Sequence, residues 1–186
     1  MIEAVRNYHP YNAQEAADQI VMLDLMKRYD DIYERENQTV HMTASAWVVD
    51  PSRTKVLMAY HRIYNSWAWL GGHADGCRDL MSVAIREVKE ESGLNNVRVI
   101  DPDIYSLEIL TVDGHEKNGQ YVPSHLHLNL TWLMEADPAE PIKAKEDENT
   151  AVAWFGLEEV YEKSTEPWFI ERIYKKLNEK LKTIPG

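Results

Sequence analysis

The spacing of apolar residues predicts a helical segment at the start of the chain. Within residues 12–34 the apolar side chains recur on one helix face, at Ala16, Ile20, Leu23 and either Leu25 or Met26. Asn12 and Glu15 have the spacing of a capping box, which satisfies backbone N–H groups of the first turn. We therefore expect residues 1–36 to form a helical extension that packs on a main domain over residues 37–186.

From residue 39 the period of the pattern changes to two, which is typical of strands. The pattern predicts strands over 39–49, 55–61, 66–70, 97–110, 121–135 and 150–155. It predicts further helices over 79–92, 157–163 and 167–181. An alternation of this kind favours an α+β sandwich, in which a mixed sheet carries helices on both faces.

The composition excludes several classes of partner. The net charge is −11, whereas nonspecific binding to nucleic acid or to an anionic membrane needs a basic surface. Cys77 is the single cysteine, so no internal disulfide is possible. No apolar run approaches the roughly 20 residues of a membrane span, and the first residues lack the apolar stretch of a signal peptide. We expect a cytoplasmic protein.

Three carboxylates on one helix face are the strongest chemical signal in the chain. Glu87, Glu90 and Glu91 stand at positions i, i+3 and i+4 of the predicted helix 79–92, so all three project from the same side. Such a cluster either faces water or binds a hard divalent cation. Ligand sets of oxygen atoms suit Mg2+ or Mn2+ rather than Zn2+.

The segment from residue 72 to 94 resembles the Nudix box, whose pattern is G-x5-E-x7-R-E-U-x-E-E-x-G-U with U aliphatic. The matching residues are Gly72, Arg86, Glu87, Val88, Glu90, Glu91, Gly93 and Leu94. One position departs from the pattern, because Arg78 stands where the first glutamate is expected and Asp79 follows it. The resemblance implies a Nudix-type α/β/α sandwich. It also implies a metal-dependent hydrolase that cleaves a diphosphate bond in a nucleoside diphosphate linked to another group.

The same resemblance implies roles for particular residues. Glu87, Glu90 and Glu91 would bind Mg2+ or Mn2+, joined by the backbone carbonyl of Gly71, and Glu90 and Glu91 would act in catalysis. An acidic residue outside the box would serve as base or fourth ligand, with Glu148 as the first candidate and Glu116 as the second. Within the box, Gly72 and Gly93 would be structural. Arg86 would hold the loop by pairing with Asp79, since Arg78 has the wrong charge for that contact.

Two histidines form a second candidate site. Alternation in residues 124–131 places His125, His127, Asn129 and Thr131 on one strand face, opposite a row of leucines. Imidazoles can bind phosphate oxygens or a base edge, so both histidines are candidates for substrate binding, as is Arg62. The alternative is an ordinary half-exposed sheet face. A zinc site would need a third ligand, which the sequence does not assign.

Two other functions stay open at this level. Isopentenyl-diphosphate isomerases share the fold that the resemblance implies, but they use a cysteine placed elsewhere than Cys77. A Nudix domain that senses nucleotides without cleaving them usually lacks box carboxylates, and this chain keeps three. The expected partner is a small-molecule diphosphate, and a homodimer is an alternative to a monomer.

Overall fold

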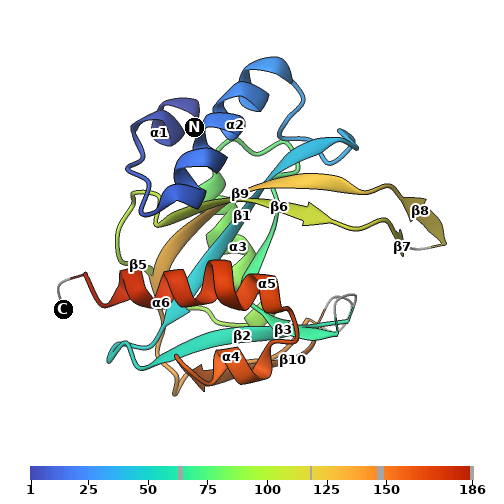
Figure 1. Ribbon diagram of the computed structural model, residues 1–186. Coiled ribbons are helices and arrows are strands. Elements are labelled where there is room, and N and C mark those ends of the chain that lie inside the picture. Colours follow the sequence, from blue (N-terminus) through green and yellow to red (C-terminus); the bar gives the residue numbers. More distant parts are fainter. Residues whose placement is uncertain (63–64, 118, 146–148, 185–186) are drawn as a thin grey trace. The chain divides into compact units, whose positions relative to one another are not determined.

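The computed structural model describes residues 1–62, 65–117, 119–145 and 149–184 (Figure 1). Its helical segments are α1 (Ile2–Asn7), α2 (Ala13–Arg28), α3 (Leu80–Ser92), α4 (Val160–Lys163), α5 (Pro167–Phe169), the π-helix η1 (Ile170–Tyr174) and α6 (Lys175–Leu181). Its strands are β1 (Val40–Val49), β2 (Lys55–His61), β3 (Ser66–Ala68), β4 (Leu70–His73), β5 (Arg98–Val99), β6 (Ser106–Val112), β7 (His115–Lys117), β8 (Gln120–Val122), β9 (His125–Glu135) and β10 (Asn149–Gly156).

The described strands form a mixed sheet, as the alternating pattern predicted. The order of hydrogen-bonded strands is β10-β2-β1-β9-β5, with β3 paired to β2, β4 to β1 and β6 to β9. Strands β1 and β9 run parallel, because Leu126 N donates to Thr39 O and Ala136 N donates to Val49 O, each at 3.0 Å. The pairs β2–β10 and β6–β9 are antiparallel. The predicted α+β class is therefore confirmed.

The chain divides into two compact units. The first comprises Met1–Ser45, Gly71–Ala84 and Asp101–Trp132, and the second comprises Ala46–Leu70, Ile85–Ile100 and Leu133–Gly186. Strands β1 and β9 and helix α3 each contribute residues to both units.

The first unit contains the N-terminal segment. Asn12 caps α2 by accepting a hydrogen bond from Glu15 N at 2.9 Å, as predicted. The Glu15 carboxylate is fully buried, and it accepts hydrogen bonds from Tyr8 Oη at 2.7 Å and from Ser106 Oγ at 2.8 Å. Since Ser106 belongs to β6, this contact fastens α2 to the sheet. Figure 1 shows α1 and α2, in blue, beside β6 and β9.

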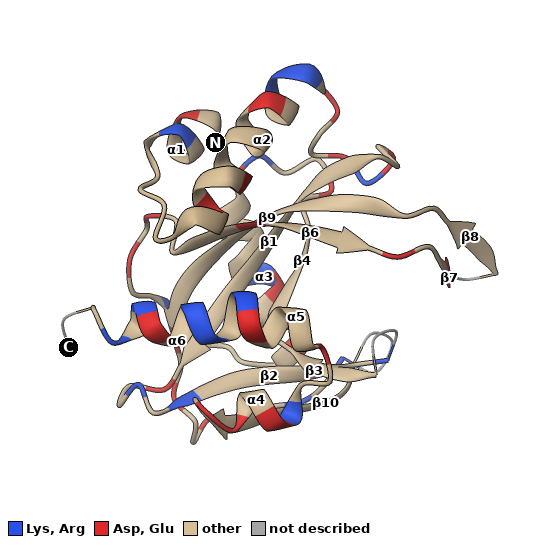
Figure 2. Cartoon of the chain, viewed as in Figure 1, with Lys and Arg blue, Asp and Glu red and all other residues tan. Residues whose placement is uncertain are grey.

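Aromatic side chains fill the core of the second unit. Trp47 of β1 stacks on Tyr174 with 5.6 Å between ring centroids, and Trp69 meets the same tyrosine edge-on at 6.0 Å. Trp67 is half-buried against Phe155 and Tyr60. These tryptophans pack with neighbouring aromatic rings. Helix α6 has one acidic residue, Glu179, among three lysines (Figure 2).

Several predicted boundaries were wrong. Helix α2 ends at Arg28 rather than at residue 34, and Tyr29 is already extended. The predicted strand 97–110 is split into β5 and β6 by a segment that contains Pro102, because proline cannot donate to a ladder. Pro123 likewise separates β8 from β9, and β8 pairs instead with the unpredicted β7.

The described part of the chain contains no helix of the length and hydrophobicity that a membrane crossing requires.

Candidate active site

Helix α3 carries the three predicted carboxylates on one side, which continues the line of its buried stripe toward the C-terminal end of the helix. The stripe consists of fully buried residues, namely Leu80, Val83, Ala84 and Val88. The side chains of Glu87, Glu90 and Glu91 are 12%, 46% and 2% exposed, respectively. The carboxylate cluster therefore runs from a buried end at Glu91 to an open end at Glu90. A substrate or ion arriving from solvent would meet Glu90 first.

Basic side chains offset the repulsion within this cluster. Arg86 places Nη2 2.8 Å from Glu87 Oε1 and Nε 3.8 Å from Glu90 Oε1. Lys145 places Nζ 3.4 Å from Glu90 Oε2. Since Arg86 and Glu90 are more than two-fifths exposed, each such pair contributes no more than about 1 kcal/mol to stability. Their larger effect is local, because two cations offset the negative charge at the open end of the cluster.

Glu91 is held in place by residues from two strands of the sheet. Asn149, the first residue of β10, donates Nδ2 to Glu91 Oε1 at 3.1 Å, and His61 Nε2 lies 3.8 Å from the same oxygen. Asn149 is fully buried, and its Oδ1 has no hydrogen-bond partner among the described residues. Carboxylates beside an unsatisfied amide oxygen form an oxygen-rich donor set, which fits a hard cation such as Mg2+ or Mn2+.

Gly71 of β4 and Gly93 after α3 both stand where the backbone favours glycine. A Cβ on Gly71 would lie 2.5 Å from both Ala44 O and Ser45 Oγ, so this position admits no side chain. Gly93 has a φ of +73° and donates its N–H to Lys89 O at 2.9 Å, which ends the helix as predicted. The carbonyl of Gly71 as a metal ligand stays a prediction.

Two other predicted site residues lie outside the box. Glu148 lies outside the described residues, while Arg62 is exposed directly after β2.

The residues at the start of the helix make two contacts that the sequence did not predict. Asp79 Oδ1 accepts a hydrogen bond from Ser82 N at 3.2 Å, which caps α3. The Arg78 guanidinium lies over the Tyr33 ring at 4.9 Å, a cation–π contact that explains a basic residue at this position. The pairing of Asp79 with Arg86 remains a prediction.

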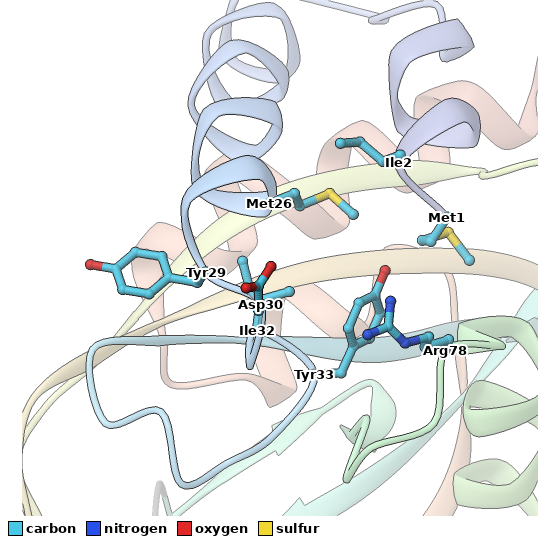
Figure 3. Close-up of a pocket in the computed structure, with 8 residues that line it drawn as sticks. All are labelled: Met1, Ile2, Met26, Tyr29, Asp30, Ile32, Tyr33 and Arg78. Atoms are coloured by element: carbon cyan, nitrogen blue, oxygen red, sulfur yellow. The ribbon is translucent and has the colours of Figure 1, made fainter.

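Arg78 also lines a small cavity in the first unit (Figure 3). Its volume is about 200 Å³, and its other lining residues come from the N-terminal segment: Met1, Ile2, Met26, Tyr29, Asp30, Ile32 and Tyr33. Burial raises the pKa of Tyr33, and the nearby Arg78 opposes that shift. The cavity therefore lies where the N-terminal segment meets the box loop.

A cluster of imidazoles lies in the first unit. His125 and His127 of β9 lie side by side, with 3.1 Å between their Nε2 atoms, as the alternation predicted. Two histidines that the sequence did not single out join them, His41 from β1 and His73 from β4, with ring centroids 4.8–5.1 Å apart. The alternation of His41, Thr43 and Ser45 along β1 was the signal that could have identified His41.

Burial sets the charge of this cluster. Desolvation lowers the pKa of His127 well below its ordinary value, and the charges of His73 and His41 lower it further. Burial also lowers the pKa of His41, although its hydrogen bond to Asn37 opposes that shift. Both imidazoles are therefore neutral at pH 7. They offer lone pairs and N–H groups rather than positive charge, and substrate binding by His125 and His127 stays a prediction.

Comparison with known proteins gives a family match and a set of similar folds. A model of the NUDIX domain matches residues 39–177. An Ap4A hydrolase binary complex from C. elegans is 19% identical, covers 76% of this chain and 95% of its own, and has a TM-score of 0.52. A Nudix hydrolase from M. smegmatis, RenU, is 18% identical with coverage of 78% and 88% and a TM-score of 0.55.

A third similar structure is the E. coli dihydroneopterin triphosphate pyrophosphohydrolase. It is 15% identical, covers 73% of this chain and 95% of its own, and has a TM-score of 0.51. At such low identity these likenesses show a shared fold. No curated protein matched the chain.

Proposed function

Because the chain belongs to the Nudix hydrolase family, whose enzymes act on phosphorus-containing anhydrides, we propose that it is a metal-dependent pyrophosphohydrolase. Its substrate is a nucleoside diphosphate linked to another group. The observation that carries the proposal is the arrangement on α3, where Glu87, Glu90 and Glu91 share one face. Glu91 is buried, Glu87 is largely buried and Glu90 is open to solvent. Three carboxylates at this spacing are the ligands that a hard divalent cation prefers.

The metal would be held by these three glutamates and by the carbonyl of Gly71. When bound, Mg2+ or Mn2+ neutralises phosphate oxygens and lowers the pKa of a coordinated water. Glu91 is fixed by Asn149 and excluded from solvent, so it suits the role of a permanent ligand. Glu90 is open to solvent, which suits a group that meets both ion and substrate.

The cations near Glu90 suit a role in receiving the substrate. Lys145 and Arg86 both lie within 4 Å of that carboxylate. They can release it and turn to the phosphate oxygens, because both side chains are long and partly exposed. Arg62 is a further candidate for such a contact. We retain Glu148 as the proposed base or fourth ligand.

The alternatives receive less support. A nucleotide-sensing module has no need of three carboxylates on one face. An isomerase mechanism would require Cys77 as an acid or base. The Cys77 thiol lies 3.6 Å from Asp79 O and 3.7 Å from Ser82 Oγ, contacts that tie it to the start of α3.

We also propose a cytoplasmic location and leave the choice between monomer and homodimer to measurement.

A turnover screen tests this function. The purified chain is incubated with nucleotide sugars, dinucleoside polyphosphates, oxidised dNTPs and non-nucleotide diphosphates, each with Mg2+, Mn2+ or EDTA, and products are identified by 31P NMR. We expect cleavage of a diphosphate bond in at least one nucleoside-linked compound, abolished by EDTA. Cleavage that persists in EDTA, or no cleavage of any compound with either metal, would contradict the proposal.

A further inference from the structure

Four histidines of the first unit converge on one point of the sheet. His73, His41 and His127 stand on the neighbouring strands β4, β1 and β9, and His125 stands two residues before His127. One ring nitrogen from each of His41, His73 and His127 lies within 4.8 Å of the others. The chain has seven histidines in all, so more than half of them gather here.

Backbone carbonyls fix the orientation of two of these rings. His41 Nδ1 lies 2.9 Å from Asn37 O, and His125 Nδ1 lies 2.8 Å from Pro123 O. A carbonyl only accepts, so each Nδ1 carries the proton and each Nε2 of the neutral ring carries a lone pair. Histidines that bind metals are usually oriented by such a second hydrogen bond.

The lone pair of His41 is buried and unused. His41 is 3% exposed, and its Nε2 has no hydrogen-bond partner in the described part of the chain. A buried polar atom without a partner costs about 1–3 kcal/mol, so such an atom needs an explanation. A bound ion at this nitrogen would provide one.

His125 completes the arrangement by positioning its neighbour. In the tautomer with the proton on His125 Nδ1, His125 Nε2 accepts and His127 Nε2 donates across the 3.1 Å contact. A neutral imidazole that donates from one nitrogen keeps a lone pair on the other. His127 therefore has a nitrogen available for coordination, while His125 acts through it as a positioning residue.

We propose that His41, His73 and His127 bind one divalent ion of the borderline transition series, with Zn2+ as the representative. Imidazole nitrogen suits such ions, whereas Mg2+ and Mn2+ prefer the oxygen ligands of α3. Bonds of about 2.0–2.1 Å would draw the three nitrogens to roughly 3.4 Å from one another, a shift of the order of 1 Å. Three protein ligands leave a fourth position for water or a small anion.

Metal titration of the full chain tests this site. After removal of metals with a chelator, the protein is titrated with Co2+, which reports four-coordinate binding through visible absorption bands, and with Zn2+ by calorimetry. We expect one Zn2+ per chain at micromolar or tighter affinity, retained in a large excess of Mg2+. His73→Ala should weaken binding at least about 10-fold, because one of three ligands is lost.

Two controls separate this site from other sources of binding. His9→Ala removes an exposed histidine of the same unit and should leave Zn2+ affinity unchanged. Glu90→Gln should also leave it unchanged, since that carboxylate belongs to the other site. The proposal is overturned if Zn2+ fails to bind, if Glu90→Gln rather than His73→Ala removes binding, or if Co2+ gives only the weak spectrum of six oxygen ligands. The Co2+ spectrum of the unmodified protein decides the matter even if His73→Ala does not fold.

Discussion

Replacing Glu15 tests how the N-terminal segment is fastened to the sheet. The carboxylate is fully buried and accepts three hydrogen bonds, from Tyr8 Oη and Tyr11 N at 2.7 Å each and from Ser106 Oγ at 2.8 Å. Glu15→Ala removes the carboxylate that these three donors share, although Ser106 Oγ keeps Glu108 as an acceptor. It leaves the cap of α2 intact, because Asn12 binds the backbone N–H of residue 15.

The hydrogen-bond inventory gives the expected magnitude. Hydrogen bonds to a charged group contribute about 1.5–3 kcal/mol each. Tyr11 is partly exposed, Tyr8 keeps a 3.2 Å contact with Tyr105 O, and Ser106 keeps Glu108 as an acceptor, so roughly half of the full sum applies. We therefore expect Glu15→Ala to lower the free energy of unfolding by about 2–4 kcal/mol. For a chain of this length that corresponds to a fall in Tm of roughly 4–16 °C.

Glu15→Gln is the matched control. Its amide oxygen can serve Tyr8 and Tyr11 while its NH2 group donates to Ser106, whose hydroxyl also accepts. We expect this variant to lose no more than about 1 kcal/mol. Urea unfolding followed by circular dichroism measures both variants. A loss below about 1 kcal/mol in Glu15→Ala would refute the reasoning, and equal losses in the two variants would show that charge, not acceptor number, matters.

Two further predictions concern the framework of the sheet. Gly71→Ala should cost about 2–3 kcal/mol in a thermal melt, because its Cβ would lie 2.5 Å from Ala44 O. Gly119→Ala meets no atom within 4 Å but has a φ of +75°, so it should cost only the roughly 1 kcal/mol of its backbone conformation. A loss in Gly71→Ala no larger than that in Gly119→Ala would contradict the steric argument. Burial raises the pKa of Asp50, but hydrogen bonds from Ser52, Lys55 and Thr54 outweigh it and hold the pKa below its ordinary 3.8. The ionised carboxylate therefore stabilises the fold above its ordinary pKa, and this stabilisation is lost as the pH falls through the lower pKa of the folded state. Asp50→Asn should make the free energy of unfolding depend less on pH below about pH 4. Urea unfolding at a series of pH values measures this dependence, and an unchanged dependence would contradict the prediction.

Periodicity predicted the elements well where side chains decide them. The range of β2 was predicted correctly, and α3 and β1 each begin one residue later than expected, because their buried faces repeat at the period of a helix or a strand. The prediction failed where local chemistry outweighs period. Pro102 and Pro123 interrupt otherwise continuous strand patterns.

The candidate site was predictable only along a single element. Spacing within one helix placed Glu87, Glu90 and Glu91 on one face, and spacing within one strand placed His125 beside His127. Residues brought in from other elements, such as Asn149 beside Glu91, were not predictable, because their proximity depends on strand pairing. His41 joins His127 for the same reason, since the parallel pairing of β1 with β9 has no local signal.

The central claim is that the open carboxylate of α3 supports metal-dependent hydrolysis, and Glu90→Gln tests it most directly. The measurement is kcat with Mg2+ on the best substrate of the screen, beside Glu179→Gln, which alters an exposed glutamate of α6. We predict that Glu90→Gln lowers kcat at least about 100-fold, or roughly 2.7 kcal/mol of barrier, while its unfolding free energy stays within about 0.5 kcal/mol of wild type. Glu179→Gln should match wild type in both respects. Turnover by Glu90→Gln within about twofold of wild type at saturating Mg2+ would contradict the account.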